Sequence, residues 1–357
     1  VWIMAYTTID DPTIYFNTKL YTGTGSELAI TGVGFQPDWV WSKNRDQSEG
    51  HRLFDSVRGA TKFIRSNNSD AEGTAAQTLK SFDSDGVTIG TDADMNTSSE
   101  KNVLWNWLAG GSASSNSNGT ITSSVSASTT AGFSIVSYTS NGSASQTVGH
   151  GLGAVPQMII SKNRDSGSSS YNYWTVYHHS LATANDKKLK LNTTDAASST
   201  NEWGDTDPTS TVYSVHTGGD GTTNHSSDKI IAYCFAEKKG YSKFGSYTGN
   251  GNSDGTFVYT GFRPAWFLVK RTDGSDHWTL WDNKRETTMN PNDNVLYPST
   301  NGAESSSDTS YACDFLSNGI KWRGTSTGMN TSGGTYIYIA FAESPFVNSN
   351  GVPTTAR

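Results

Sequence analysis

The segment Asn201–Pro208 carries the residues whose types and spacing best suit ligand recognition. Trp203 is followed by Asp205 and Asp207 in a stretch that is otherwise polar. Carbohydrate sites commonly combine an aromatic ring, which stacks on the sugar, with carboxylates that accept hydrogen bonds from its hydroxyl groups. We therefore predict a ligand-binding site at these three residues. The favoured alternative is that Trp203 packs a loop against the core, and exposure of its ring separates the two interpretations.

Two further patterns resemble metal sites but lack a complete ligand set. The sequence Asp83-Ser-Asp-Gly86 is followed by Asp92 and Asp94, without the Asp-x-Asp-x-Asp-Gly order and distal Glu of a calcium loop. A plain turn is therefore favoured there. His178 and His179 are adjacent, so on a strand they face opposite ways, and no second cluster has ligand spacing. We predict no metal site and no cofactor.

Lysines at the ends of three similar strands could attract an anionic glycan. They are Lys43, Lys162 and Lys270, and Arg45 and Arg164 accompany the first two. The favoured alternative is that each forms a surface ion pair with the aspartate that follows it, worth ~0–1 kcal/mol. These aspartates are Asp46, Asp165 and Asp273.

No catalytic motif is recognisable in the sequence. It has no Gly-x-Ser-x-Gly elbow, no phosphate-binding loop and no zinc motif. We therefore expect no catalytic residues and no enzymatic activity. Paired carboxylates are the one open enzymatic option, because a glycosidase needs only two acids at a suitable distance.

A repeated unit organises the elements that would position these residues. The unit is Gly, a large apolar residue, Pro, an apolar run and then Lys. Its prolines, Pro37, Pro156 and Pro264, stand 119 and 108 residues apart. This spacing is too long for a solenoid repeat and matches a small domain. We predict three homologous modules in tandem, with these prolines at the same strand entrance.

Composition indicates an all-β fold. Aromatic residues make up 11% of the 357 residues, including 11 Trp, which excludes a disordered chain. No stretch has sustained helical periodicity, and turn signals recur every few residues. The predicted fold class is three tandem antiparallel β-sandwich modules of jelly-roll or lectin-like type.

The predicted boundaries follow the repeats and the polar stretches between them. They are an N-terminal lead-in (1–16), module one (17–110), a linker (111–131), module two (132–237), module three (238–347) and a C-terminal tail (348–357). The linker is almost all Ser, Gly, Asn, Thr and Ala, which is typical of a flexible spacer. Within it, 121–125 alternates once, as an edge strand would.

Charge and hydropathy exclude several partners. The net charge is −7 and no basic stripe is evident, so no nucleic-acid partner is expected. No apolar run approaches the ~18 residues of a membrane span, so no membrane insertion is expected. The N-terminal residues lack the basic start and apolar core of a signal peptide. Cys234 and Cys313 have no metal-like spacing and give no support for a disulfide.

Four motifs together resemble a known family. They are Gly-Phe-x-Pro followed by an apolar run and Lys-Asn-Arg (34–45), Leu-Phe-Asp-Ser-Val-Arg-Gly-Ala-Thr-Lys (53–62), Tyr-Thr-Gly-Asn-Gly (247–251) and Ala-Phe-Ala-Glu (340–343). With them the chain, from Met4 to about Phe346, resembles a repeated domain of unknown function. That domain is common in virion-associated proteins of marine tailed phages, including those of cyanobacteria.

The resemblance implies a non-enzymatic virion structural protein that is tail-fibre-like or a lectin-like adhesin. We expect such a protein to be synthesised in the host cytoplasm and located in the virion. The expected partners are other virion proteins and host surface polysaccharide. A homo-oligomer is expected because edge strands need cover, and a trimer is favoured because the tail fibres that this chain resembles usually form symmetric oligomers. The alternatives are a polysaccharide-degrading enzyme of the virion and a cell-surface lectin or filament subunit.

Overall fold

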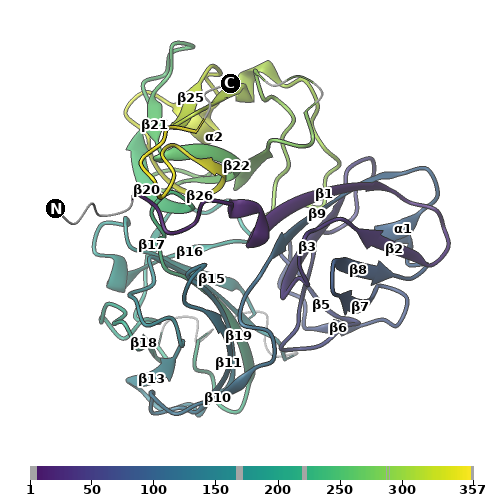
Figure 1. The fold of residues 1–357 in the computed structure, drawn as a ribbon. Helices are drawn as coiled ribbons and strands as arrows, with labels where there is room; N and C mark the ends of the chain where they lie inside the picture. The colour runs from purple at the N-terminus through teal and green to yellow at the C-terminus, as the bar shows by residue number, and fades with distance from the viewer. Residues whose placement is uncertain (1–5, 166–171, 219–222, 287, 289, 355–357) are drawn as a thin grey trace.

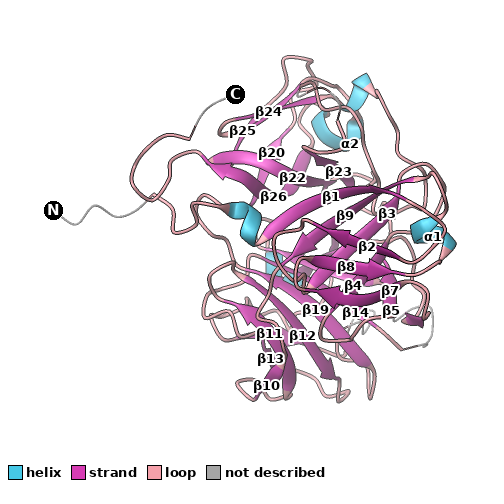
Figure 2. Ribbon diagram, turned by 45° about the vertical axis from the view of Figure 1, so that its right-hand side comes forward, coloured by secondary structure: helices cyan, strands magenta, loops and turns pink. Residues whose placement is uncertain are grey.

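Antiparallel sheets dominate the fold. The computed structural model describes residues 6–165, 172–218, 223–286, 288 and 290–354. Helix is limited to short turns (Figure 2), so the all-β prediction is confirmed. None of the helices in these ranges is long and apolar enough to cross a membrane. The sheets form three groups that follow one another along the chain (Figure 1).

The first group contains a six-stranded and a three-stranded sheet. The six-stranded sheet has the order β1 (Phe16–Thr22), β9 (Lys101–Trp107), β3 (Trp39–Asn44), β4 (Arg52–Asp55), β5 (Lys62–Arg65) and β6 (Gly73–Thr74). The smaller sheet has the order β2 (Leu28–Thr31), β8 (Gly86–Ile89) and β7 (Leu79–Asp83). Short helical turns precede β1 and β9, at η1 (Pro12–Ile14) and α1 (Ala93–Asn96).

The second group contains an eight-stranded and a two-stranded sheet. The larger sheet has the order β10 (Ser114–Asn116), β11 (Ser123–Ser128), β12 (Phe133–Thr139), β19 (Lys229–Phe235), β14 (Met158–Asn163), β15 (Trp174–His178), β16 (Lys187–Lys190) and β17 (Ser198–Ser199). The smaller sheet pairs β13 (Gln146–Gly149) with β18 (Val212–Val215). The turn η3 (Ala184–Asp186) precedes β16.

The third group contains a four-stranded and a three-stranded sheet. The larger sheet has the order β20 (Ser242–Thr248), β26 (Thr335–Pro345), β22 (Phe262–Arg271) and β23 (Thr279–Asp282). The smaller sheet has the order β21 (Phe257–Tyr259), β25 (Gly319–Trp322) and β24 (Cys313–Leu316). The short turns are η4 (Thr309–Tyr311) and α2 (Thr327–Asn330).

Four strands take the same order in each large sheet. The orders are β1-β9-β3-β4, β12-β19-β14-β15 and β20-β26-β22-β23. In each group the residue two positions after the repeated proline pairs with an aromatic residue of the closing strand. These pairs are Trp39 with Trp107, Met158 with Phe235 and Trp266 with Phe341. The register therefore gives matched positions in the three groups, whereas the domain boundaries stay a prediction.

The first group shows how alternation divides its side chains between two cores. Val40 and Leu104 pack with Val87 of the smaller sheet, in an apolar cluster within the group. Trp39 and Trp41 alternate with Val40 and belong to a different cluster. Because strand side chains point alternately to opposite faces, the large sheet buries one face against its partner sheet and the other face elsewhere.

The other face lies against a core that all three groups share. Trp39 is 4.5 Å from Tyr233 of the second group, measured between ring centroids. Trp107 lies 5.6 Å from Trp266 of the third group, and Phe235 lies 6.0 Å from Phe341. The three groups surround this centre in Figure 1. The preference for a core role of Trp39 and Trp41 is therefore confirmed.

Three polar segments, here called crossings, connect the groups in a closed cycle. They contain Glu72, Ala197 and Glu304. The Glu72 amide of the first group donates to the Arg164 carbonyl of the second at 2.9 Å. The Ala197 amide of the second donates to Thr272 of the third at 2.9 Å, and the Glu304 amide of the third donates to Arg45 of the first at 2.8 Å. The crossing of each group is thus hydrogen-bonded to the next group, and that of the third group to the first. We call these three contacts clasping hydrogen bonds.

Residues 111–131 are not the predicted flexible spacer. They contain β10 and β11, and β11 pairs with β12 along its whole length. The buried side chains of Ile121 and Val125 anchor the segment, and sheet pairing satisfies its backbone groups. A Ser-rich composition therefore does not prevent strand formation where a neighbouring strand is available.

Candidate functional site

The predicted site at Trp203, Asp205 and Asp207 is wrong. Trp203 is only 2% exposed, and its indole Nε1 donates to the Lys187 carbonyl at 3.2 Å. Its ring meets the Tyr177 ring edge-on at 5.8 Å. Asp205 and Asp207 are exposed, and Asp207 accepts a 3.3 Å hydrogen bond from the Tyr177 hydroxyl. The ring packs the loop inward while the carboxylates face solvent, so no sugar can stack there.

The aspartate-rich turn is held together by its own hydrogen bonds. Asp83 accepts from the hydroxyls of Ser81 and Thr88, both at 2.7 Å. Asp85 accepts from backbone amides, of which Gly34 is the closer at 2.7 Å, and these bonds lower the pKa of its carboxyl. The favoured interpretation as a plain turn fits this geometry. Within the described ranges no three His, Cys, Asp or Glu side chains cluster as metal ligands would.

The strand-end lysines are not surface groups, contrary to prediction. Lys43, Lys162 and Lys270 are fully buried. The Lys162 ammonium donates to the carbonyls of Asn163 and Asn172, both at 2.7 Å, and burial lowers its pKa to about 7. Each long side chain turns inward and binds loop carbonyls, so none is available to grip a glycan.

The adjacent histidines connect the second group to the third. The Ser180 amide donates to His178 Nδ1 at 3.2 Å, which leaves the proton on Nε2, 3.3 Å from the Tyr338 carbonyl. The His179 Nε2 atom lies 3.0 Å from the Phe244 carbonyl. Both residues therefore act as structural contacts between groups.

This arrangement predicts acid sensitivity. Burial, reinforced by the nearby His179, lowers the pKa of His178 from 6.5 to about 3. Between these values the unfolded chain binds more protons than the folded chain. The free energy of unfolding therefore rises with pH in this interval and decreases as the pH is lowered. We expect a slope of up to ~1.4 kcal/mol per pH unit from this one group. Urea titrations from pH 4 to 8 should show a shallower dependence for His178→Gln, and an unchanged slope would contradict the assignment.

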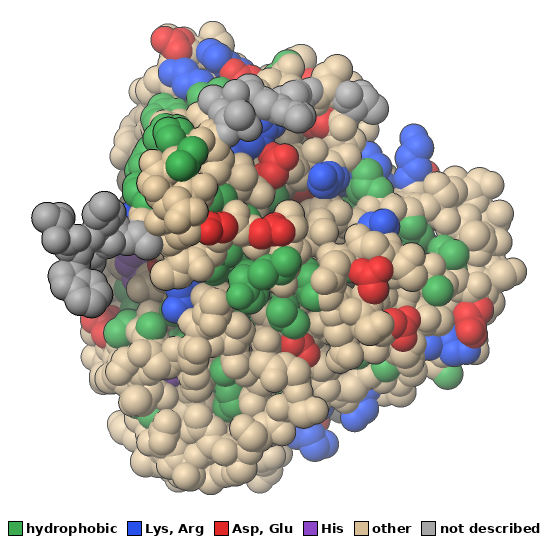
Figure 3. Space-filling view, in the orientation of Figure 1, with side chains coloured by type: hydrophobic (Ala, Val, Ile, Leu, Met, Phe, Trp, Pro, Cys, Tyr) green, Lys and Arg blue, Asp and Glu red, His purple; other side chains and the backbone are tan. Residues whose placement is uncertain are grey.

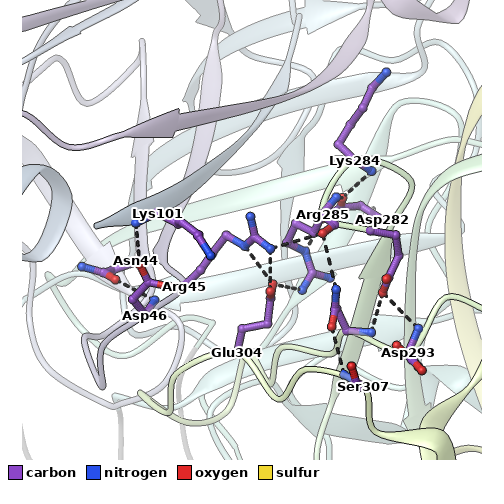
Figure 4. Close-up of polar contacts among 12 residues, drawn as sticks. Asn44, Arg45, Asp46, Lys101, Asp282, Lys284, Arg285, Asp293, Glu304 and Ser307 are labelled. Atoms are coloured by element: carbon purple, nitrogen blue, oxygen red, sulfur yellow. Dashed lines mark hydrogen bonds and ion pairs between the residues drawn. The ribbon is translucent and has the colours of Figure 1, made fainter. Parts of the chain in front are cut away.

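A buried ion network, shown in Figure 4, brings two carboxylates together. Arg285 Nε donates to Asp282 at 2.6 Å, and its Nη1 donates to Glu304, also at 2.6 Å. Arg45 from the first group reaches the same Glu304 at 2.6 Å. Burial would raise the pKa of the Asp282 carboxyl, but the Arg285 guanidinium outweighs it and the pKa lies below its usual value. This carboxyl is held ionised and is unsuited to act as a general acid.

A second carboxyl pair has divergent pKa values. Burial and a hydrogen bond to Asp94 raise the pKa of Glu49, whereas Arg52 overcomes burial and lowers that of Asp94. Asp94 pairs with Arg52 and lies 3.5 Å from Arg65 Nη2, so this carboxylate is engaged in structural ion pairs.

The strongest candidate for ligand binding is an aromatic hollow beside β21. Phe257 and Tyr259 are 42% and 52% exposed, whereas Val258 between them is buried. Because alternate residues share a face of a strand, the two rings point to the same side. Figure 3 shows green side chains over the part of the third group where Figure 1 labels β21.

Polar groups surround the rim of this hollow, whose volume is about 310 Å³. Tyr6 and Tyr259 line it with their hydroxyls 3.1 Å apart, and this bond raises the pKa of Tyr6 to about 12. The Lys239 ammonium lies 4.3 Å from the centre of the Tyr6 ring. Glu237 and Lys243 form a 2.8 Å ion pair at the rim. The hollow combines a stacking surface with hydrogen-bonding groups of both kinds.

The sequence carried a weak signal for this site. Phe257-Val-Tyr259 alternates, as does any half-buried strand, but alternation does not reveal which face is covered. Tyr6 lies far from β21 along the chain and contacts it only through the fold.

A family model spans nearly the whole of this architecture. The model is described as Domain of unknown function (DUF7483), and it matches residues 11–345. The chain belongs to this family. The matched range includes the strands of all three groups, from β1 to β26. A search of curated proteins found no match.

Proposed function

We propose that this member of the DUF7483 family is a non-enzymatic virion structural protein that acts as an adhesin and binds host surface polysaccharide at the hollow lined by Tyr6 and Tyr259, beside which Phe257 is exposed on the same face of β21. The exposed rings on β21 carry this proposal. Large apolar side chains that lie together on a surface mark interaction sites. A sugar ring stacks on such a surface and offers its hydroxyls to the rim.

The closed body supports an adhesin role. The shared core and the three clasping crossings fix β21 relative to the rest of the chain. A rigid site loses less conformational entropy on binding than a flexible one. The resemblance to virion-associated phage proteins supports a place on the particle. The recurring strand order supports three tandem lectin-like modules of jelly-roll type.

The binding part of the proposal predicts a large effect at one ring. Tyr259→Ala should weaken binding to polysaccharide purified from the host surface by roughly tenfold, because it removes the stacking face. Ile14 is similarly exposed, at 45%, but lies in η1 outside the hollow, so Ile14→Ala serves as the matched control. Surface plasmon resonance measures both variants, and equal loss in the two would reject the site.

Two further observations separate the classes of function. Antibodies against the chain should label intact phage particles in electron micrographs, and labelling only of cell surfaces would favour a lectin or filament subunit. Incubation with the same polysaccharide should release no reducing sugar ends. Their release would show a polysaccharide-degrading enzyme.

A further inference from the structure

The three junctions between groups are built from matched positions. The register places Arg58, Arg285 and Leu181 at one position after β4, β23 and β15. The crossings place Glu72, Glu304 and Ala197 at a second position, because their amides make the three clasping hydrogen bonds. The acceptors of those bonds, Arg164, Arg45 and Thr272, define the third.

Charged side chains fill two of these junctions. Between the first and second groups, Glu72 accepts from Arg58 at 3.2 Å and from Arg164 at 2.9 Å. Between the third and first groups, Glu304 accepts from Arg285 and Arg45, both at 2.6 Å (Figure 4). Each junction therefore buries one carboxylate between two guanidinium groups.

The junction between the second and third groups lacks all three charges. Leu181, Ala197 and Thr272 stand at the matched positions and are much smaller than Arg and Glu. All three line a cleft of about 370 Å³. Its volume lies within the range of small-molecule sites, ~300–1,000 Å³. We call this space the junction cleft.

Hydrogen bonds keep this junction closed although the ion network is missing. His178 and His179 contact the carbonyls of Tyr338 and Phe244 across it. The Ala197 amide donates to the Thr272 carbonyl across it at 2.9 Å. The cleft is therefore a formed space between fixed walls.

The lining combines one cation, several hydroxyls and an apolar floor. The half-buried Lys187 donates to Ser199 Oγ at 2.7 Å, a neutral acceptor, and no carboxylate of the described residues is paired with it. Hydroxyl groups come from Ser180, Ser246 and Thr335. Ala182 is exposed and Ala197 is half-buried, and both supply apolar surface beside the buried Ile337 and Leu181.

We propose that the junction cleft binds a small hydroxylated carboxylate, such as a single acidic sugar unit. The ligand's carboxylate pairs with Lys187, which replaces a neutral contact by a charge-assisted one. Its hydroxyls bond the Ser and Thr side chains, which both donate and accept. Its apolar face packs on Ala182 and Ala197. This site is separate from the aromatic hollow and does not depend on it.

Isothermal titration with D-glucuronate tests the proposal on the whole chain. A ligand of this size should bind with Kd on the order of 1 mM. Lys187→Met should weaken binding at least tenfold, and D-glucose should bind at least tenfold more weakly than glucuronate. Lys62 occupies the matched position on β5 of the first group, so Lys62→Met is the control and should leave binding unchanged.

A second variant places in the cleft the charged residues that the other two junctions have at the matched positions. Thr272→Arg combined with Ala197→Glu places a matched ion pair there, and glucuronate binding should disappear while thermal unfolding shows a folded protein. Lys187→Met keeps the test decisive if the double variant does not fold. No glucuronate binding at ~10 mM, full binding by the double variant, or equal loss with Lys62→Met would each overturn the proposal.

Discussion

Trp39→Ala should lower the free energy of unfolding by ~3–5 kcal/mol, because it removes a large ring from the core that the groups share. Trp39 is 1% exposed, and its ring lies 4.4 Å from that of Trp107 in its own group. It also lies 4.5 Å from Tyr233 and 5.6 Å from Phe133, both in the second group. The substitution therefore leaves a cavity between two groups.

Guanidinium denaturation measures this loss. Phe257→Ala is the matched control, because Phe257 is an aromatic residue that is 42% exposed. It should change stability by less than ~0.5 kcal/mol. A loss below ~1 kcal/mol for Trp39→Ala would mean that the shared core does not hold the groups together.

Glu304→Gln should destabilise the chain by a similar ~3–5 kcal/mol, because it leaves Arg285 and Arg45 buried without their shared counter-ion. The Glu304 side chain is 5% exposed, and Arg285 is completely covered. The remaining Asp282 neutralises only one of the two guanidinium groups.

The matched control is Glu27→Gln. Glu27 also pairs with a cation, Lys80, but its side chain is 59% exposed, so solvent screens the pair. Removing it should cost less than ~1 kcal/mol. Equal effects of the two substitutions in denaturant melts would show that the Glu304 network does not bind the third group to the first.

Alternation and the repeated prolines made part of this fold predictable from the sequence. Trp39 and Trp41 flank Val40 in a strand, and matched positions elsewhere are apolar, which indicated core residues. β3 begins two residues after Pro37 and β14 begins two residues after Pro156, as predicted. The prediction is wrong for Pro264, which lies inside β22, where the pairing with β26 is irregular.

Local polarity misled the predictions where distant contacts decide the outcome. Trp203 lies in a polar stretch, but its ring packs inward beneath the loop, because burying it is favourable wherever the fold allows. Lys162 follows the pattern of a surface lysine. Its ammonium instead reaches the Ser69 carbonyl of the first group at 3.3 Å. Neither contact has a signal in the neighbouring residues.

The candidate sites were beyond sequence reasoning for the same reason. Tyr6 meets Tyr259 only through the fold. The junction cleft appears only when Leu181, Ala197 and Thr272 are compared with the charged residues at matched positions. Without the register, no pattern aligns Ala197 with Glu72 and Glu304.

Calorimetric unfolding of the whole chain tests the central claim, which is that three groups of sheets form one closed body. Because the groups share one core and each clasps the next, we predict a single transition in which the calorimetric and van't Hoff enthalpies agree. Two or three separable transitions, or a van't Hoff enthalpy near one third of the calorimetric value, would show independent domains and contradict the account.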